Sequence, residues 1–168
     1  YAHNKGCVVR AGDIMGTIAI AANPASGRDI RRLVSHATVY SNREKENIVE
    51  RVILAAYAMG GHKAIIMPDS FGFGIHIQRH LEEDLLELPR GVVNIPDVPY
   101  MDKQEDTTYF AAYAEQQGCD VLVVLGGDGT SRAAAKGVEH IPVIALSTGT
   151  NNVYPDMVEG TIAGVAAS

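Results

Sequence analysis

The sequence is poor in cysteine, in long apolar runs and in positive charge, and each scarcity narrows the class of protein. Its two cysteines, Cys7 and Cys119, lack the spacing of a metal site and give little reason to expect a disulfide, so we expect a reducing cytoplasm. No apolar stretch is long enough to cross a bilayer, and residues 1–14 lack the apolar centre of a signal peptide. With 14 Lys and Arg against 20 Asp and Glu, the net charge of -6 argues against nucleic acid or an anionic membrane as the main partner.

Two common phosphate-binding patterns are also missing. The sequence has no Gly-x-x-x-x-Gly-Lys-Ser/Thr loop. Gly72-Phe73-Gly74 begins like the dinucleotide fingerprint Gly-x-Gly-x-x-Gly, but Ile77 stands where the third glycine belongs. The most common nucleotide-binding folds are therefore poor matches.

Strand and helix patterns alternate along the 168 residues, which are enough for one domain with a sizeable core. This alternation predicts an α/β fold with a parallel sheet and right-handed crossovers. We expect residues 1–14 to be an N-terminal extension or an added segment, and residues 15–168 to form the domain. The predicted strands are 17–21, 63–67, 91–95, 121–125 and 141–146, and the predicted helices include 28–36, 75–88, 102–118 and 158–167.

Capping boxes mark two helix starts, one at Ser41 with Glu44 and one at Asp102 with Glu105. On the helix predicted over residues 75–88, His76 and His80 lie one turn apart, with Glu83 or Asp84 a turn further. That spacing can bind a metal, but the His-Glu-x-x-His pattern is absent. We interpret these residues as an exposed helix face and predict no metal site.

Gly126-Gly127-Asp128-Gly129-Thr130 directly follows the apolar run from Val121 to Leu125, which is typical of a buried parallel strand. Glycines at the end of such a strand let the backbone turn sharply and approach a ligand closely. The helix that follows would direct its free N–H groups at that ligand, and phosphate is the usual one. A carboxylate repels phosphate unless a metal or a transferable proton is involved, so this loop suggests a phosphoryl-transfer site.

Two more polar loops follow predicted strands, at residues 23–27 and 147–152. Each loop alone could be an ordinary turn. The carboxyl ends of parallel strands share one edge of the sheet, however, and ligands bind at that edge. Together the loops supply backbone donors, hydroxyls and amides that suit phosphate oxygens and ribose hydroxyls.

These three loops, in this order, resemble the signature loops of the NAD kinase and diacylglycerol kinase superfamily. Residues 29–33 and 148–153 are similar to the ATP-NAD kinase-like branch that includes acetoin-catabolism protein X. The resemblance covers about residues 15–168 and implies a three-layer α/β/α nucleotide-binding domain of the NAD kinase N-terminal type. Family members continue into a β-rich domain that completes the substrate site, and we expect that domain to be absent from this chain.

The resemblance also implies roles for individual residues. Asp128 would accept the proton of the acceptor hydroxyl as it attacks the γ-phosphorus of ATP; alternatively it would hold Mg²⁺, or only form the turn. Mg²⁺ would be bound through the nucleotide, and NAD is a possible acceptor. The residues expected to bind the nucleotide and its phosphates are Asn23, Pro24, Ser26, Gly27, Gly126, Gly127, Gly129, Thr130, Thr148, Gly149, Thr150, Asn151 and Asn152.

Three functions remain open on these grounds. The first is an ATP-dependent phosphotransferase of the NAD kinase type, with ATP or polyphosphate as donor, of which this chain alone would be an inactive part. The second is a diacylglycerol-type lipid kinase, which the negative net charge disfavours. The third is a nucleotide-sensing module linked to acetoin catabolism. By resemblance, we expect a homo-oligomer whose partner is a small-molecule nucleotide.

Overall fold

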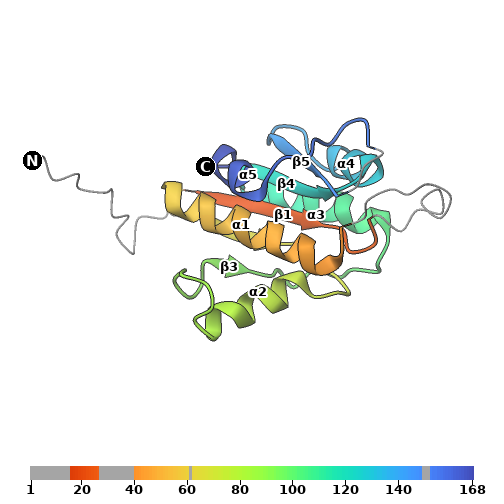
Figure 1. The fold of residues 1–168 in the computed structure, drawn as a ribbon. Coiled ribbons are helices and arrows are strands. Elements are labelled where there is room, and N and C mark those ends of the chain that lie inside the picture. Colours follow the sequence, from red (N-terminus) through yellow and green to blue (C-terminus); the bar gives the residue numbers. More distant parts are fainter. Residues whose placement is uncertain (1–15, 27–39, 61, 149–151) are drawn as a thin grey trace, which may run out of the picture.

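Five parallel strands form a single sheet in the order β3-β2-β1-β4-β5, with helices on both of its faces (Figure 1). The structure, a computed structural model, describes residues 16–26, 40–60, 62–148 and 152–168. The strands are β1 (Thr17–Ala22), β2 (Lys63–Ile66), β3 (Val93–Asn94), β4 (Val121–Gly126) and β5 (Val143–Ser147). The helices are α1 (Asn42–Gly60), α2 (Phe73–Glu82), α3 (Gln104–Gln116), α4 (Asp128–Ala135) and α5 (Gly160–Ala166).

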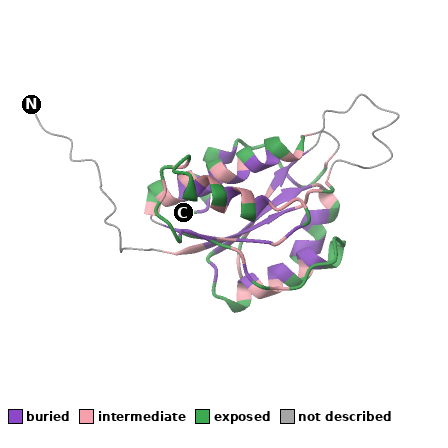
Figure 2. Cartoon of the chain, turned by 90° about the horizontal axis from the view of Figure 1, so that it is seen from below, coloured by how far each residue is buried: buried purple, intermediate pink, exposed green. Residues whose placement is uncertain are grey.

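The two faces of β1 and β4 divide the core into two apolar clusters. Ile18 and Ile20 on one face pack with α1, α2 and α5, whereas Ala19 and Ala21 on the other pack with α3 and α4. In β4, Val123 belongs to the first cluster and its neighbours to the second, as the two-residue period of a strand requires. Buried residues accordingly lie on the sheet and on the helix faces that cover it (Figure 2). The expected three-layer α/β/α architecture is confirmed.

Helix α5 packs closely on α1 through two glycines that are one turn apart. A Cβ atom added to Gly164 would lie 2.7 Å from Cβ of Ala55 and would also collide with the carbonyl oxygen of Val52. One added to Gly160 would lie 2.9 Å from the carbonyl oxygen of Ile48. The absence of side chains at these two positions therefore sets how near the two helices approach.

The first predicted capping box is present, and the second is built differently. The N–H of Ser41 donates to Glu44 Oε2 at 2.6 Å, and the N–H of Glu44 donates to Ser41 Oγ at 3.2 Å. These bonds lower the pKa of the Glu44 carboxyl. Before α3 the capping carboxylate belongs to Asp106, not to Glu105. Asp106 Oδ2 accepts hydrogen bonds from the backbone N–H groups of residues 101 and 103, each at 2.9 Å.

Helix α2 ends at Glu82, earlier than the predicted limit of residue 88. Asp84 has a φ of 55°, in the left-handed region, and the N–H of Leu85 donates to the carbonyl of His80 at 2.8 Å. This is a Schellman ending, with aspartate where glycine is usual, and the sequence pattern did not reveal it. Strand β3 is also shorter than predicted, with only two residues paired to β2.

Several predictions fall outside the described residues: the extension 1–14, the basic helix 28–36, and the loop residues Gly27, Gly149, Thr150 and Asn151. Among the described residues, we find no helix with both the length and the apolar character needed to cross a membrane.

Candidate functional site

The loops that follow β1, β4 and β5 meet at the carboxyl edge of the sheet beside a cavity of about 940 Å³. Strands β1 and β4 are neighbours, while the chain leaves them in opposite directions across the sheet, toward β2 and β5. Parallel sheets bind ligands at such a switch point. The predicted site residues that line this cavity are Asn23, Pro24, Ser26, Gly127, Asp128, Gly129, Thr130 and Asn152.

Side-chain hydrogen bonds tie the first loop to the other two. Asn23 Nδ2 donates to Thr130 Oγ1 at 3.1 Å, which joins the β1 loop to the β4 loop. The hydroxyls of Ser26 and Thr148 lie 2.9 Å apart, which joins the β1 loop to the β5 loop. Thr148 is 1% exposed and is absent from the cavity lining, so it supports Ser26 from behind.

Asp128 makes the third connection, between the β4 loop and the chain after β5. Its Oδ1 accepts the N–H groups of Val153 at 2.9 Å and of Tyr154 at 2.8 Å, and its Oδ2 accepts the N–H of Val153 at 3.1 Å. Each of the three loops is thus bonded to both of the others. The closed arrangement fixes the cavity wall before any ligand arrives.

A buried lysine lies under the β1 loop. Lys45, on the first turns of α1, is 1% exposed, and its ammonium donates to the carbonyl oxygens of Asn23 at 3.1 Å, Pro24 at 3.3 Å and Ser26 at 2.8 Å. It also donates to Asn42 Oδ1 at 3.3 Å. Three carbonyl groups of one short loop therefore point inward at a single cation, which determines the loop's shape.

The three glycines of the β4 loop have different surroundings. An added Cβ would lie 2.5 Å from the Thr130 side chain at Gly126 and 2.8 Å from Asn152 Oδ1 at Gly127. At Gly129, by contrast, the nearest atom would be Gln104 Nε2 at an ordinary 3.8 Å. Gly126 and Gly127 thus serve the packing of the loops, whereas Gly129 is an exposed residue in the first turn of α4 where a side chain would meet no clash.

Helix α4 begins at Asp128, inside the glycine-rich loop. The first N–H groups of an α-helix have no partner within the helix, and their dipoles favour an anion. Because α4 starts at the cavity wall, its first turn is a suitable place for phosphate oxygens.

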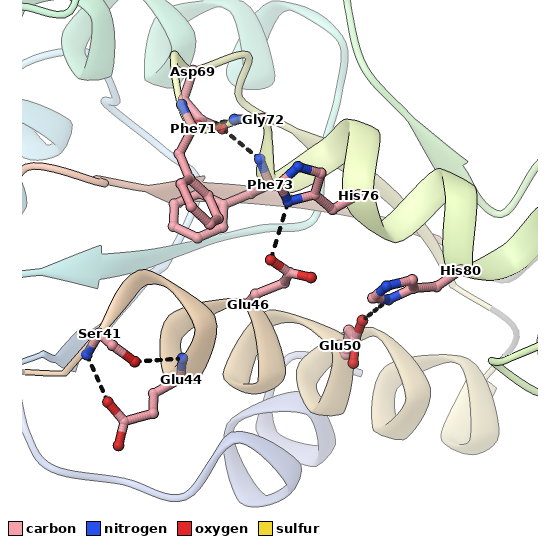
Figure 3. Close-up of polar contacts among 10 residues, drawn as sticks. All are labelled: Ser41, Glu44, Glu46, Glu50, Asp69, Phe71, Gly72, Phe73, His76 and His80. Atoms are coloured by element: carbon pink, nitrogen blue, oxygen red, sulfur yellow. Dashed lines mark hydrogen bonds and ion pairs between the residues drawn. The ribbon is translucent and has the colours of Figure 1, made fainter.

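Carboxylates dominate the rest of the cavity. Asp69, Asp102 and Asp106 line it together with Asp128, and Lys103 is a cation in the same lining. Asp69 is 7% exposed and accepts the N–H groups of residues 71, 72 and 73 at 2.8 to 3.1 Å, which caps the start of α2 (Figure 3). Burial raises the pKa of Asp69, and these N–H donors oppose that shift without cancelling it.

Sequence reasoning missed Lys45, Asp69 and the segment from Tyr100 to Thr107 as parts of this site. A lysine near a helix start and a carboxylate before a helix are ordinary surface features in a sequence. The one indication in the sequence was the glycine-rich run at residues 70–74, which follows β2 and therefore lies at the carboxyl edge of the sheet. Gly126 and Thr148 lie behind the lining, and Gly27, Gly149, Thr150 and Asn151 lie outside the described residues.

Comparison with known proteins gives two matches. The profile of the ATP-NAD kinase N-terminal domain matches residues 18–168. Acetoin catabolism protein X of Cupriavidus necator is 37% identical over 167 residues, which are 98% of this chain and 45% of that protein. The chain thus spans less than half the length of this curated relative. No solved structure matches the chain.

Proposed function

Since the chain belongs to the ATP-NAD kinase family, we propose that its cavity binds ATP with Mg²⁺ and serves phosphoryl transfer to a hydroxyl of NAD or a related acceptor. The observation that carries this proposal is the closed set of three loops around one cavity at the sheet's switch point. A cavity of about 940 Å³ is large enough for a nucleotide. We also propose a cytoplasmic homo-oligomer, on the family resemblance alone.

The phosphates would occupy the wall between the β1 loop and the start of α4. There the first N–H groups of α4 and the adjoining glycines offer donors, and Ser26 and Asn23 face them from the neighbouring loop. The buried ammonium of Lys45 lies behind the β1 loop and adds positive potential. Gly129 would permit the closest approach, because among the three glycines it is the exposed one and an added Cβ there would lie no nearer than 3.8 Å to another atom.

The acidic lining fits a nucleotide that carries a divalent cation. Four carboxylates face the cavity, and a bare triphosphate would be repelled by them. Mg²⁺ prefers oxygen ligands and keeps several waters, so it is usually held by one or two carboxylates together with the phosphates. Asp102 is the carboxylate we assign to this task, because Asp69 and Asp106 cap helices and Asp128 is bonded to the chain after β5.

In the proposed reaction, the acceptor oxygen attacks the γ-phosphorus while the bond from that phosphorus to the bridging oxygen of ADP breaks. The acceptor's proton passes to Oδ2 of Asp128. A carboxylate has about four acceptor positions. Two N–H groups occupy Oδ1, and Oδ2 accepts only the longer 3.1 Å bond from Val153, which leaves it acceptor capacity. Base catalysis would contribute roughly 10²–10⁴-fold, with positioning supplying most of the remainder.

The test is NADP formation from NAD and Mg-ATP by the longest natural form of the protein, compared with its Asp128→Asn variant. An amide oxygen can still accept the two N–H groups that Oδ1 now accepts, so the substitution removes the base while retaining the loop connection. We expect the rate to fall at least about 10²-fold while nucleotide binding persists.

Asp102→Asn is the matched control. Asp102 lines the same cavity and has a φ of 57°, a left-handed conformation that asparagine tolerates well. It removes the same charge from the proposed Mg²⁺ position without touching the proposed base, so its loss of activity should be relieved by excess Mg²⁺, whereas that of Asp128→Asn should persist. Equal losses in both variants at saturating Mg²⁺ would contradict the role of Asp128. No NADP from a folded protein that binds ATP would contradict NAD as acceptor.

One observation favours a second function, nucleotide sensing without turnover. Within the described residues, the three hydrogen bonds that Asp128 accepts all come from backbone N–H groups, which is the arrangement of a structural carboxylate. In that case ATP would bind, neither NAD nor a lipid would be phosphorylated, and Asp128→Asn would change binding alone.

A further inference from the structure

A second polar cluster lies between helices α1 and α2, away from the lining of the cavity. Glu46 and Glu50 are one turn apart on α1, and His76 and His80 are one turn apart on α2, so each pair lies on one helix face. The two faces are directed at each other (Figure 3). Nδ1 of His76 lies 3.2 Å from Glu46 Oε2, and Nδ1 of His80 lies 2.6 Å from Glu50 Oε1.

Glu46, Glu50 and His80 form one cluster of three side chains and not only two separate histidine–glutamate pairs. One ligand atom from each of Glu46, Glu50 and His80 lies within 4.8 Å of the other two. Both carboxylates are withdrawn from solvent, with side-chain exposures of 11% for Glu46 and 16% for Glu50. Each imidazole is 33% exposed, which leaves a path from solvent. This differs from a solvated acidic patch on a helix.

The charges of the cluster are incompletely balanced. Within the described parts of the chain, Glu46 and Glu50 form ion pairs with histidines only, and no lysine or arginine is paired with either. When the imidazoles are neutral, the two sheltered carboxylates therefore carry a charge that no direct ion pair among the described residues offsets. Sheltered charges in proteins are normally paired or bound to a metal. A divalent cation would provide the missing charge.

We propose that Glu46, Glu50 and His80 form a binding site for a divalent transition-metal ion, with Zn²⁺ as the best-fitting ion. Three protein ligands from carboxylate and imidazole, with water in the fourth position, are a known coordination set for zinc. Ligand atoms of a tetrahedral zinc site lie about 3.4 Å apart, a contraction that glutamate side chains can make. Magnesium and calcium prefer oxygen ligands alone, and the imidazole disfavours them.

His76 acts as a positioning residue in this site, because its ring nitrogen holds the carboxylate of Glu46. Its ring also lies edge-on to Phe71, with centroids 5.1 Å apart, and Phe71 lines the nucleotide cavity. The bound ion would join α1, which carries Lys45, to α2, whose first turn adjoins that cavity. This proposal is independent of phosphoryl transfer and holds for any function of the cavity.

The test is a Zn²⁺ titration by calorimetry of the full 168-residue chain after removal of metal by a chelator. We expect one saturable site, a rise in melting temperature with Zn²⁺, and a loss of at least about tenfold in affinity in Glu50→Gln and in His80→Gln. Melting curves in chelator report whether each variant is folded. Visible absorption of added Co²⁺, which imidazole and carboxylate ligands generate, should appear in the wild type and fade in both variants.

His140→Gln is the matched control, because His140 also pairs with a glutamate, Glu115, at 2.9 Å but, among the residues that the structure describes, belongs to no cluster of three metal-ligating side chains. Its zinc affinity should equal that of the wild type. The proposal is overturned if the wild type shows no saturable binding. It is equally overturned if folded Glu50→Gln and His80→Gln bind Zn²⁺ as tightly as the wild type, since the ion would then lie elsewhere.

Discussion

The ammonium of Lys45 lies 2.8 Å from the carbonyl oxygen of Ser26, a residue that is 19 positions earlier in the chain and that lines the cavity. This contact, together with those to two other carbonyls of the same loop, makes α1 the support of the β1 loop. An exposed lysine forms no such set of contacts. The cavity's shape therefore depends on a side chain that does not reach into it.

Replacing this lysine should damage both the fold and the site. Lys45→Met would leave three loop carbonyls without their shared donor, and we expect a loss of roughly 1–3 kcal/mol in the free energy of unfolding. ATP affinity should fall because the β1 loop loses its shape. Urea unfolding and calorimetric ATP titration measure the two effects. Lys63→Met, at an exposed position of β2, should change stability by less than about 0.5 kcal/mol, and an equal loss there would refute the argument.

Substitutions at two glycines of the β4 loop should have different effects, one on the free energy of unfolding and the other on ATP affinity. Gly126→Ala places a Cβ atom 2.5 Å from the Thr130 side chain, so we expect a loss of about 1–3 kcal/mol in unfolding free energy. Gly129→Ala meets nothing nearer than 3.8 Å and should fold normally, yet it adds a methyl group to the cavity wall where we expect the phosphates. ATP affinity should drop about tenfold, or 1.4 kcal/mol. Unchanged affinity in Gly129→Ala would argue that phosphate does not bind there.

Substitution of Gly164 in helix α5 should destabilise the protein, whereas substitution on the exposed face of the same helix should have little effect on stability. Gly164→Ala must push α5 away from the backbone of α1, so we expect a loss of about 1–3 kcal/mol in unfolding free energy. Val165→Ala, at a position that is 45% exposed in the same helix, should cost much less. Chemical denaturation compares the two variants directly. Similar losses would show that the helix contributes through its own propensity and not through this contact.

Cys119 should be inert to thiol reagents in the native protein. Burial, with Asp120 adding to the effect, raises the pKa of the Cys119 thiol to about 11 from its usual 9.0. The native state therefore holds this proton more tightly than the unfolded state, so the contribution to stability is complete below pH 9 and is lost as pH rises toward 11. In a Cys7→Ser background at pH 8, a disulfide reagent should react only after urea is added. Rapid reaction of the folded protein would contradict the burial.

Much of the fold could be read from the sequence because its strands are strongly apolar. The run from Val121 to Leu125 and that of β1 predicted the two central strands, which are buried on both faces. The short edge strand β3 and the end of α2 were misjudged. Both depend on local conformations, such as the left-handed backbone at Asp84, that residue types only weakly indicate.

The site residues that directly follow strands could be predicted from the sequence, whereas the side chains contributed by helices could not. The meeting of the three loops follows from parallel topology, and their residues line one cavity. Lys45, in contrast, comes from a helix face that a sequence pattern assigns to solvent. His76 and His80 were examined with carboxylates of their own helix, while the structure pairs them with Glu46 and Glu50, 30 positions upstream. Such pairings arise from the packing of helices and leave no local signal.

The isolated bridge between Leu146 and Asp156 also bears on how copies of this domain can associate. The chain after β5 returns to lie beside it, with the N–H of Ser147 donating to the carbonyl of Asp156 at 2.8 Å. At the opposite margin, β3 has only two residues. Long unpaired edge strands let the sheets of different molecules pair into fibrils. In this sheet the returning chain lies beside one edge strand, β5, and the other edge strand, β3, is very short. Growth of a continuous sheet from one copy of the domain to the next is thereby disfavoured at both margins.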